Sequence, residues 1–169
     1  VTTEDVVGAD VVLVFDLSSS MDEGTKWSSL KTAADTFIDK MLGNGNPNQN
    51  RIAIVAYSRY YKTLLGWTDS ATTAKNSYKY YGTGRDRITI NSATHLNQLL
   101  ELNAGTNCQA GFYAADVMLD TARSAALPYV VYMSDGEANS YYAELNCNNP
   151  RHWNDWDHGR SCYEITTDI

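Results

Sequence analysis

The sequence predicts an α/β protein with an open, doubly wound and mostly parallel sheet flanked by helices. Three short stretches, residues 11–15, 52–57 and 129–133, are continuously apolar or aromatic. Such stretches are typical of parallel strands, because helices cover both faces of a parallel sheet and bury both sets of side chains. Helical patterns lie between them, and strands that alternate with helices indicate βαβ units.

The remaining elements follow from local patterns. Residues 30–41 carry apolar side chains at three- and four-residue steps, and we expect this helix to end at Gly43 in a left-handed cap. A second helix is expected to open at residues 105–107 and to stop before Pro128. Residues 60–67 predict a strand at an edge of the sheet, and residues 93–102 predict a shorter helix.

The length of 169 residues predicts a single domain. Residues 69–92 and 137–169 are polar, rich in aromatic residues and without a clear period, so we expect them to be inserted loops or arms. Long loops in compact domains are usually functional, and the segment 137–169 starts at the end of the last predicted strand.

Charge and cysteine content limit the possible partners and compartments. The net charge of −7 argues against nucleic acid as a partner. No apolar run reaches the roughly 20 residues of a membrane helix, so no membrane insertion is expected in this segment. Cys147 and Cys162 bracket a polar loop that a disulfide would stabilise, which hints at an oxidising compartment, and Cys108 would then be free or paired elsewhere.

Polar residues follow the predicted strands where ligand sites are expected. Asp16, Ser18 and Ser20 alternate directly after the first strand, and Asp135 follows the last one. Both aspartates therefore fall at the carboxyl edge of the sheet, and Thr106 adds a hydroxyl at the start of a helix. Carboxylate and hydroxyl oxygens suit Mg²⁺, Mn²⁺ or Ca²⁺ and match zinc poorly.

These residues resemble the metal-ion-dependent adhesion site of von Willebrand factor A-type domains. Asp16, Ser18 and Ser20 match the Asp-x-Ser-x-Ser motif, and Thr106 and Asp135 match the Thr and Asp that complete the site. Among members of the family, the chain is most similar to bacterial cell-surface and pilus-tip adhesins. The resemblance implies one divalent cation, bound directly or through water by the three hydroxyls, with the aspartates acting largely through water.

The resemblance also implies a function and a location. A cation held mainly by neutral hydroxyls keeps positive charge, and a Glu or Asp of a partner protein can complete its shell. We therefore expect an extracellular adhesion module, at the cell surface or on a pilus, that binds matrix or cell-surface proteins and is not an enzyme. Because the family fold continues past Asp135 with a further helix and strand, the domain is expected to be incomplete at its C-terminus.

Other interpretations remain open. Polar residues at a strand-to-helix turn are commonly caps. A glycan-binding module with a structural cation is the first alternative, and its ligand contacts would come from the aromatic residues Trp153, Trp156, Tyr141 and Tyr142. A metal-dependent hydrolase is the second, although the chain has no Gly-x-Ser-x-Gly elbow and no phosphate-binding glycine loop.

Overall fold

The computed structural model describes residues 8–58, 61–79, 81–84, 87–90, 106–136, 141–144 and 163–166. Its elements are, in order, β1 (Ala9–Asp16), the 3₁₀ helix η1 (Ser19–Asp22), α1 (Lys26–Leu42), β2 (Arg51–Tyr57), β3 (Tyr61–Thr68), α2 (Ala71–Lys79), β4 (Tyr81–Gly84), β5 (Arg87–Ile90), α3 (Cys108–Leu119), β6 (Leu127–Met133), β7 (Tyr141–Glu144) and β8 (Tyr163–Thr166). The helix expected over 93–102 lies outside the described residues.

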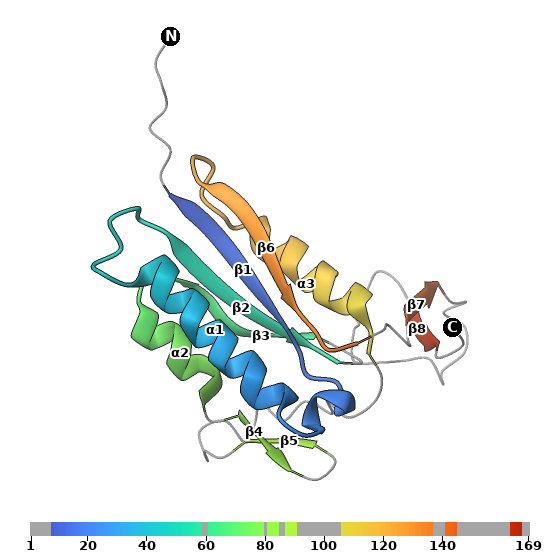
Figure 1. Cartoon of the computed structure of the whole chain (residues 1–169). Helices are drawn as coiled ribbons and strands as arrows, with labels where there is room; N and C mark the ends of the chain where they lie inside the picture. The colour runs from blue at the N-terminus through green and yellow to red at the C-terminus, as the bar shows by residue number, and fades with distance from the viewer. Residues whose placement is uncertain are drawn as a thin grey trace.

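Four strands form one sheet in the order β3-β2-β1-β6 (Figure 1). Strand β1 runs parallel to both β2 and β6, whereas β3 pairs antiparallel with β2 at the edge. The predicted mostly parallel α/β sheet and the predicted edge strand are therefore confirmed. Two further antiparallel pairs, β4 with β5 and β7 with β8, form separate ribbons.

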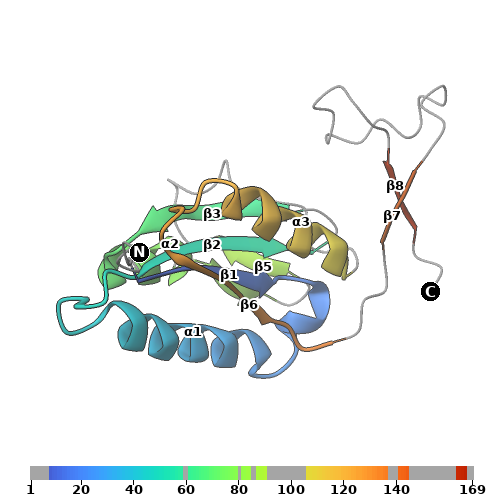
Figure 2. The same ribbon diagram turned by 90° about the horizontal axis from the view of Figure 1, so that it is seen from above.

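Helices cover both faces of the four-stranded sheet (Figure 2). Side chains of β1 alternate between the two faces: Val11, Leu13 and Phe15 pack with α1 and α2, while Val12 and Val14 pack with α3. Every residue of β1 is buried. The apolar run of β1 is therefore explained as predicted: helices cover both faces of this central parallel strand, so neither face is exposed to solvent.

Helix α1 packs one apolar stripe against the sheet and ends differently from the prediction. Its buried residues are Trp27, Leu30, Ala34, Ile38 and Leu42. The expected left-handed cap at Gly43 is wrong, because this residue has a φ of −71° and ψ of 176°. The positive φ angles come later, in the turn at Asn44, Gly45 and Asn46, so the chain leaves the helix extended and reverses afterwards.

Strand β6 is more exposed than its sequence predicts. The prediction that it is buried on both faces is wrong: Tyr129 is 52% exposed and Val130 is 40% exposed. Tyr129 and Val130 are adjacent and therefore point to opposite faces, so both faces of β6 are partly open here, and among the described strands β6 pairs only with β1. Pro128 lies within β6 instead of ending the helix, and proline is tolerated in a strand at a sheet edge.

The segment 69–92 is not a loop throughout. Residues 71–79 form α2, which packs against α1 and β3. Tyr78, which the sequence placed in an exposed aromatic loop, is 1% exposed, and its hydroxyl donates a hydrogen bond to Asp35 on α1. The contact with α1 buries a segment whose own polarity suggested exposure.

The second predicted helix is shorter than expected. Helix α3 ends at Leu119, eight residues before the expected stop at the residue preceding Pro128. Thr121 and Ala122 donate backbone hydrogen bonds to the last turn of the helix, which reverses the chain toward β6.

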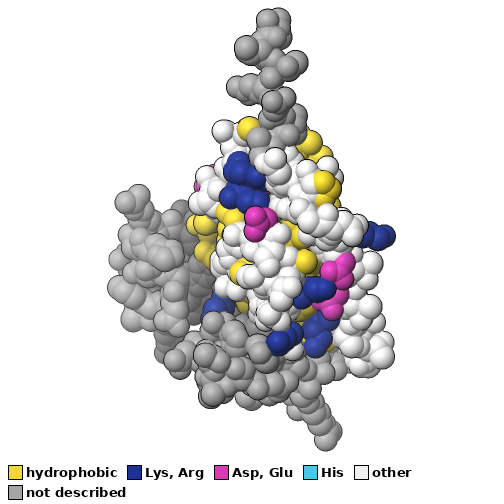
Figure 3. All heavy atoms as spheres, turned by 90° about the vertical axis from the view of Figure 1, so that its left-hand side faces the viewer, with side chains coloured by type: hydrophobic (Ala, Val, Ile, Leu, Met, Phe, Trp, Pro, Cys, Tyr) yellow, Lys and Arg dark blue, Asp and Glu magenta, His cyan; other side chains and the backbone are white. Residues whose placement is uncertain are grey.

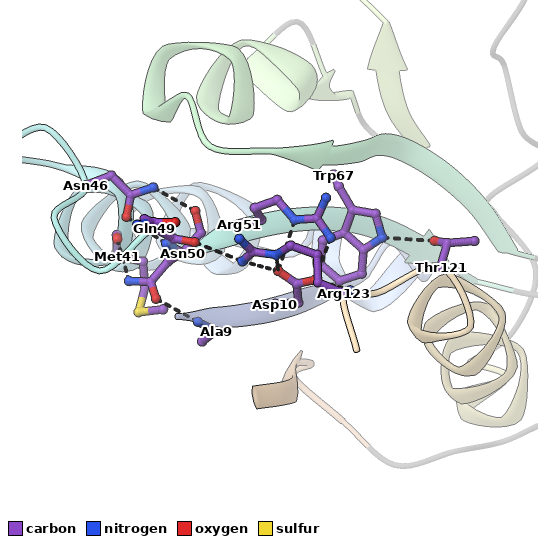
Figure 4. A network of polar contacts seen from close by, with 10 residues as sticks. All are labelled: Ala9, Asp10, Met41, Asn46, Gln49, Asn50, Arg51, Trp67, Thr121 and Arg123. Atoms are coloured by element: carbon purple, nitrogen blue, oxygen red, sulfur yellow. Dashed lines mark hydrogen bonds and ion pairs between the residues drawn. The ribbon is translucent and has the colours of Figure 1, made fainter. Parts of the chain in front are cut away.

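At the opposite end of the strands from the candidate site, a buried carboxylate joins three segments (Figure 4). Asp10 on β1 is fully buried and accepts hydrogen bonds from the side chains of Arg51 and Arg123 and from the Arg123 backbone. Burial alone would raise the pKa of Asp10, but these hydrogen bonds outweigh it and hold the pKa well below its usual range. The carboxylate therefore ties β1 to β2 and to the turn before β6.

A second polar contact closes the same end of the sheet. The side chain of Asn50 accepts a hydrogen bond from Ala9 and donates one to the carbonyl of Met41, both at 2.9 Å. The Arg51 guanidinium lies 5.2 Å from the centre of the Trp67 ring. The loops at this end are thus held by side chains that cross between strands and helices.

Charged side chains on the face seen in Figure 3 lie in small groups of mixed sign. An ion pair at the surface joins Lys75 on α2 to Asp39 on α1, at 2.6 Å. Because Asp39 is 57% exposed, this pair differs from the buried one at Asp10 and provides a natural comparison for it.

Candidate functional site

Asp16 ends β1 with its carboxylate fully buried and held on both sides. Its Oδ1 accepts a hydrogen bond from the backbone N–H of Ser18 at 2.8 Å, and its Oδ2 accepts one from the Ser134 hydroxyl at 2.6 Å. The first bond is the Asx-type turn that short polar side chains make with the backbone two residues on. The second joins the carboxyl ends of β1 and β6.

The two serines of the motif face each other. Ser18 is extended, η1 begins at the next residue, and the hydroxyls of Ser18 and Ser20 lie 3.0 Å apart. Ser18 is 1% exposed, whereas Ser20 is half-buried. The alternating pattern therefore turns these two hydroxyls toward each other.

Asp135 completes this hydrogen-bonded chain from the neighbouring strand. Its Oδ1 accepts a hydrogen bond from Ser20 at 3.0 Å, and its Oδ2 lies 2.7 Å from the ammonium of Lys26. Although the residue follows the end of β6 at the surface, its side chain is only 11% exposed. Burial raises its pKa, but the contacts with Lys26 and Ser20 outweigh burial and lower the pKa of this carboxyl.

Thr106 reaches the same edge through the start of α3. It is 4% exposed, and the next residue, Asn107, donates a backbone hydrogen bond to the carbonyl of Ser58 just past β2. The N-cap of α3 is Asn107, whose side chain accepts from the N–H of Ala110, so Thr106 is not the cap. The structure thus links Asp16, Ser18, Ser20 and Asp135 by hydrogen bonds and places Thr106 at the same edge of the sheet.

The buried Tyr57 and the half-buried Tyr132 support the beginning of α3. The Tyr57 hydroxyl lies 3.7 Å from the Cys108 sulfur, and the Tyr132 hydroxyl donates to the Cys108 carbonyl at 3.3 Å. Burial raises the pKa of both tyrosines, so both hydroxyls stay protonated. Cys108 is a free, half-buried thiol. Ser58 carries a buried hydroxyl with no hydrogen-bond partner among the described residues.

Several residues that the sequence predicts for the disulfide and for ligand contact are not among those whose side chains the structure describes. Cys147, Cys162, Trp153 and Trp156 are outside the described residues, so the disulfide and the aromatic contacts stay predictions. Tyr141 and Tyr142 belong to β7, whose side chains are not described.

Two residues of the site were not singled out from the sequence. Ser134 directly precedes Asp135, and its position at a strand end was a usable signal. No signal in the sequence marked Lys26. Its ion pair joins the start of α1 to the end of β6, and local sequence patterns do not reveal contacts between such distant residues.

The donor set fits a hard divalent cation. Within the described part of the chain, no group of three or more His, Cys, Asp or Glu side chains gathers as a metal cluster would. Two carboxylates and neighbouring hydroxyls are instead the oxygen donors that Mg²⁺, Mn²⁺ and Ca²⁺ take. The unpartnered buried hydroxyl of Ser58, beside the start of α3, adds another oxygen at this edge.

A mostly parallel sheet covered by helices, with an aspartate and hydroxyl cluster at its carboxyl edge, is the architecture of α/β domains, which usually place their ligand sites at that edge. The family model of the von Willebrand factor type A domain matches residues 11–137. The chain belongs to this family. The resemblance based on the sequence motifs is therefore confirmed.

Solved structures extend the comparison. The von Willebrand factor domain of Mfa5, a type V pili tip protein from Porphyromonas gingivalis, is 26% identical with a TM-score of 0.61, and the match covers 88% of this chain and 44% of that one. The minor pilin PilB from Streptococcus sanguinis is 19% identical with a TM-score of 0.62, covering 95% and 38%. Proximal thread matrix protein 1 from the mussel byssus, with a zinc-occupied adhesion-site motif, is 17% identical with a TM-score of 0.56, covering 79% and 32%.

The chain spans less than half the length of each of these three structures. A search of curated proteins found no match. None of the helices among the described residues is long and apolar enough to cross a membrane.

Proposed function

We propose that this domain is an extracellular adhesion module that captures an acidic group of a protein partner through one divalent cation. The observation that carries the proposal is the hydrogen-bonded chain Ser18–Ser20–Asp135 beside the buried Asp16, at the carboxyl edge of the sheet. The similarity to pilus proteins supports a location at the cell surface or on a pilus and a role in binding rather than catalysis.

The cation would be held by the hydroxyls of Ser18, Ser20 and Thr106, with Asp16 and Asp135 accepting hydrogen bonds around it. When bound, it would supply positive charge and an open coordination position for a partner carboxylate. The chain's own contribution is rigidity: Asp16 is fixed by Ser134 and by the Ser18 backbone, so the site does not need to be assembled at the moment of binding.

Electrostatics favours neutral hydroxyls in this role. A site closed by several carboxylates would neutralise the cation and leave no attraction for another anion. Here both aspartates already have partners. Asp16 accepts hydrogen bonds from Ser134 and from the Ser18 backbone, and Asp135 contacts Ser20 and Lys26. A cation at this site therefore keeps part of its charge for the partner's acidic group.

Calorimetric titration with Mg²⁺, Mn²⁺, Ca²⁺ and Zn²⁺ tests the metal site. We expect binding of at least one hard cation by the native chain and at least about tenfold weaker binding by Asp135→Asn and Ser20→Ala, since each change removes a proposed ligand or its support. Asp39→Asn is the matched control, because it removes an exposed, ion-paired aspartate on α1. Circular dichroism shows that each variant is folded.

The partner is tested separately. Binding to a panel of matrix and cell-surface proteins should require the cation and disappear with EDTA, and Asp135→Asn should behave like the chelated protein. Equal metal affinity in Asp135→Asn, Ser20→Ala and native protein would overturn the metal assignment. Partner binding that persists in EDTA would overturn the capture mechanism and favour recognition through the aromatic loops.

A further inference from the structure

The ammonium of Lys26 lies at the candidate metal site. Lys26 is the first residue of α1, and its Nζ lies 2.7 Å from Asp135 Oδ2 and 2.9 Å from Glu23 Oε2. The two acids differ: the Glu23 side chain is 72% exposed and that of Asp135 is 11% exposed. The sheltered carboxylate of Asp135 thus has a positive charge from the chain itself on one oxygen and the Ser20 hydroxyl on the other.

This arrangement gives the Asp135 carboxylate a counter-ion from the chain itself. Asp135, Ser20 and Ser18 form a continuous chain of hydrogen bonds, and the ammonium balances the negative charge at the end of it. Among the described side chains bonded to this chain, Lys26 is the one that carries a positive charge. A divalent cation entering beside Asp135 meets a like charge a few ångströms away.

We infer that Lys26 is a built-in competitor for the metal and sets the cation affinity of the site. The inference rests on the proposed function, because it assumes that a divalent cation binds beside Asp135. The ammonium of Lys26 forms an ion pair with Asp135 on the side where the cation would bind. Binding of the cation weakens this ion pair, and Glu23, which is already within hydrogen-bond distance, retains the displaced ammonium.

The geometry explains why the competition can be reversible. Lys26 is 39% exposed, so its ammonium can move into water without disturbing the core. An ion pair whose ammonium is partly in water contributes less to stability than a fully buried one, so the ammonium can be displaced. The affinity for the metal is lowered in two ways: the cation must displace the ammonium from Asp135, and the displaced ammonium still repels the cation at close range.

Metal titration of three lysine variants tests the inference. We expect Lys26→Met to bind Mg²⁺ or Mn²⁺ about three- to tenfold more tightly than the native chain, because the competing charge is gone. Lys26→Arg keeps the charge and should bind as the native chain does. Lys40→Met is the matched control: it removes the same charge from the last turn of α1, about 20 Å away along the helix, beyond the screening length of about 8 Å at physiological salt.

A metal-free measurement tests the ion pair itself. In EDTA, the effects of Lys26→Met and Asp135→Asn on the melting temperature should be less than additive in the double variant, because either change removes the same contact. Additive effects would show that the two side chains do not interact in solution and would overturn the inference.

The two proposals fail in different ways. If the native chain binds metal and Lys26→Met binds it equally or more weakly, the competitor role is wrong and the metal site stands. If neither protein binds Mg²⁺, Mn²⁺ or Ca²⁺ in the titration, the metal site is wrong and the inference falls with it.

Discussion

Replacing Asp10 by asparagine removes the negative charge shared by two arginines while keeping the size of the side chain. In the native protein this carboxylate is fully buried and receives five hydrogen bonds from Arg51 and Arg123. Asparagine offers one acceptor oxygen, and its amide group would face guanidinium donors. Two partly buried positive charges would then lose the counter-ion that they share.

The magnitude follows from the burial of the three groups. Breaking a buried ion pair by removing one partner costs roughly 3–5 kcal/mol. The two arginine side chains are 26% and 27% exposed, so water can partly replace the lost partner. We therefore expect the lower end, a loss of about 3 kcal/mol in the free energy of unfolding, or about 6–12 °C in melting temperature for a chain of this length.

Urea unfolding followed by circular dichroism at about pH 7 measures this loss. The control is Asp39→Asn, which breaks the exposed pair with Lys75 and should change stability by less than about 1 kcal/mol. The pH dependence gives a second check. Because the folded-state pKa of Asp10 is depressed, its contribution is complete above the unfolded value of about 3.9 and is lost as the pH falls below it. The native chain should therefore approach the variant in strong acid. Equal losses for Asp10→Asn and Asp39→Asn would refute this reasoning.

Two further changes test the packing around the site and at the opposite end. In Gly111→Ala, the added methyl group would lie 2.7 Å from the Tyr132 hydroxyl and 2.7 Å from the Tyr57 ring, so we expect a net loss of about 1–2 kcal/mol by urea unfolding even after the gain in helix propensity. Gly66→Ala, with no atom within 4 Å of the new methyl group, should have little effect, and an equal loss there would contradict the packing account. Asn50→Ala removes the side-chain partners of the Ala9 N–H in β1 and of the Met41 carbonyl in α1, and should cost about 1–3 kcal/mol in the same assay. Asn48→Ala, at an exposed position, is the control and should cause no measurable change.

The parts of the fold that the sequence predicts are those encoded locally. The apolar runs of β1 and β2 and the stripe of α1 are visible within a few residues, and all three elements form. The site motif is also local in its pieces: Asp16, Ser18 and Ser20 lie within five residues, and the strand ends bring Asp135 to the same edge. The parallel pairing of β1 with β6 places the carboxyl ends of these two strands, and so Asp16 and Asp135, at one edge of the sheet.

The features that escaped prediction depend on contacts between distant segments. Asp10 alone looks like a polar residue at a strand start, and only the fold brings Arg51 and Arg123 to it. Tyr78 sits in a polar stretch and is buried because α2 packs against α1. Strand β6 departs from the prediction in the other direction: its sequence matches a buried central strand, but it is the last strand of the described sheet and its side chains are partly exposed. Local composition cannot distinguish these cases.

The pairing of β1 with β6 also determines when the site can form during synthesis. The bond from Ser134 to Asp16 joins residues 118 positions apart. At about 5–20 residues per second, roughly 6–24 s pass between the synthesis of these two residues. Until β6 is synthesised, β2 is the one described strand with which β1 can pair in parallel, and the loop that closes afterwards is long. A chain stopped before β6 would therefore contain the Asp-x-Ser-x-Ser motif without the Ser134 bond that fixes its carboxylate, so the complete site forms late during synthesis.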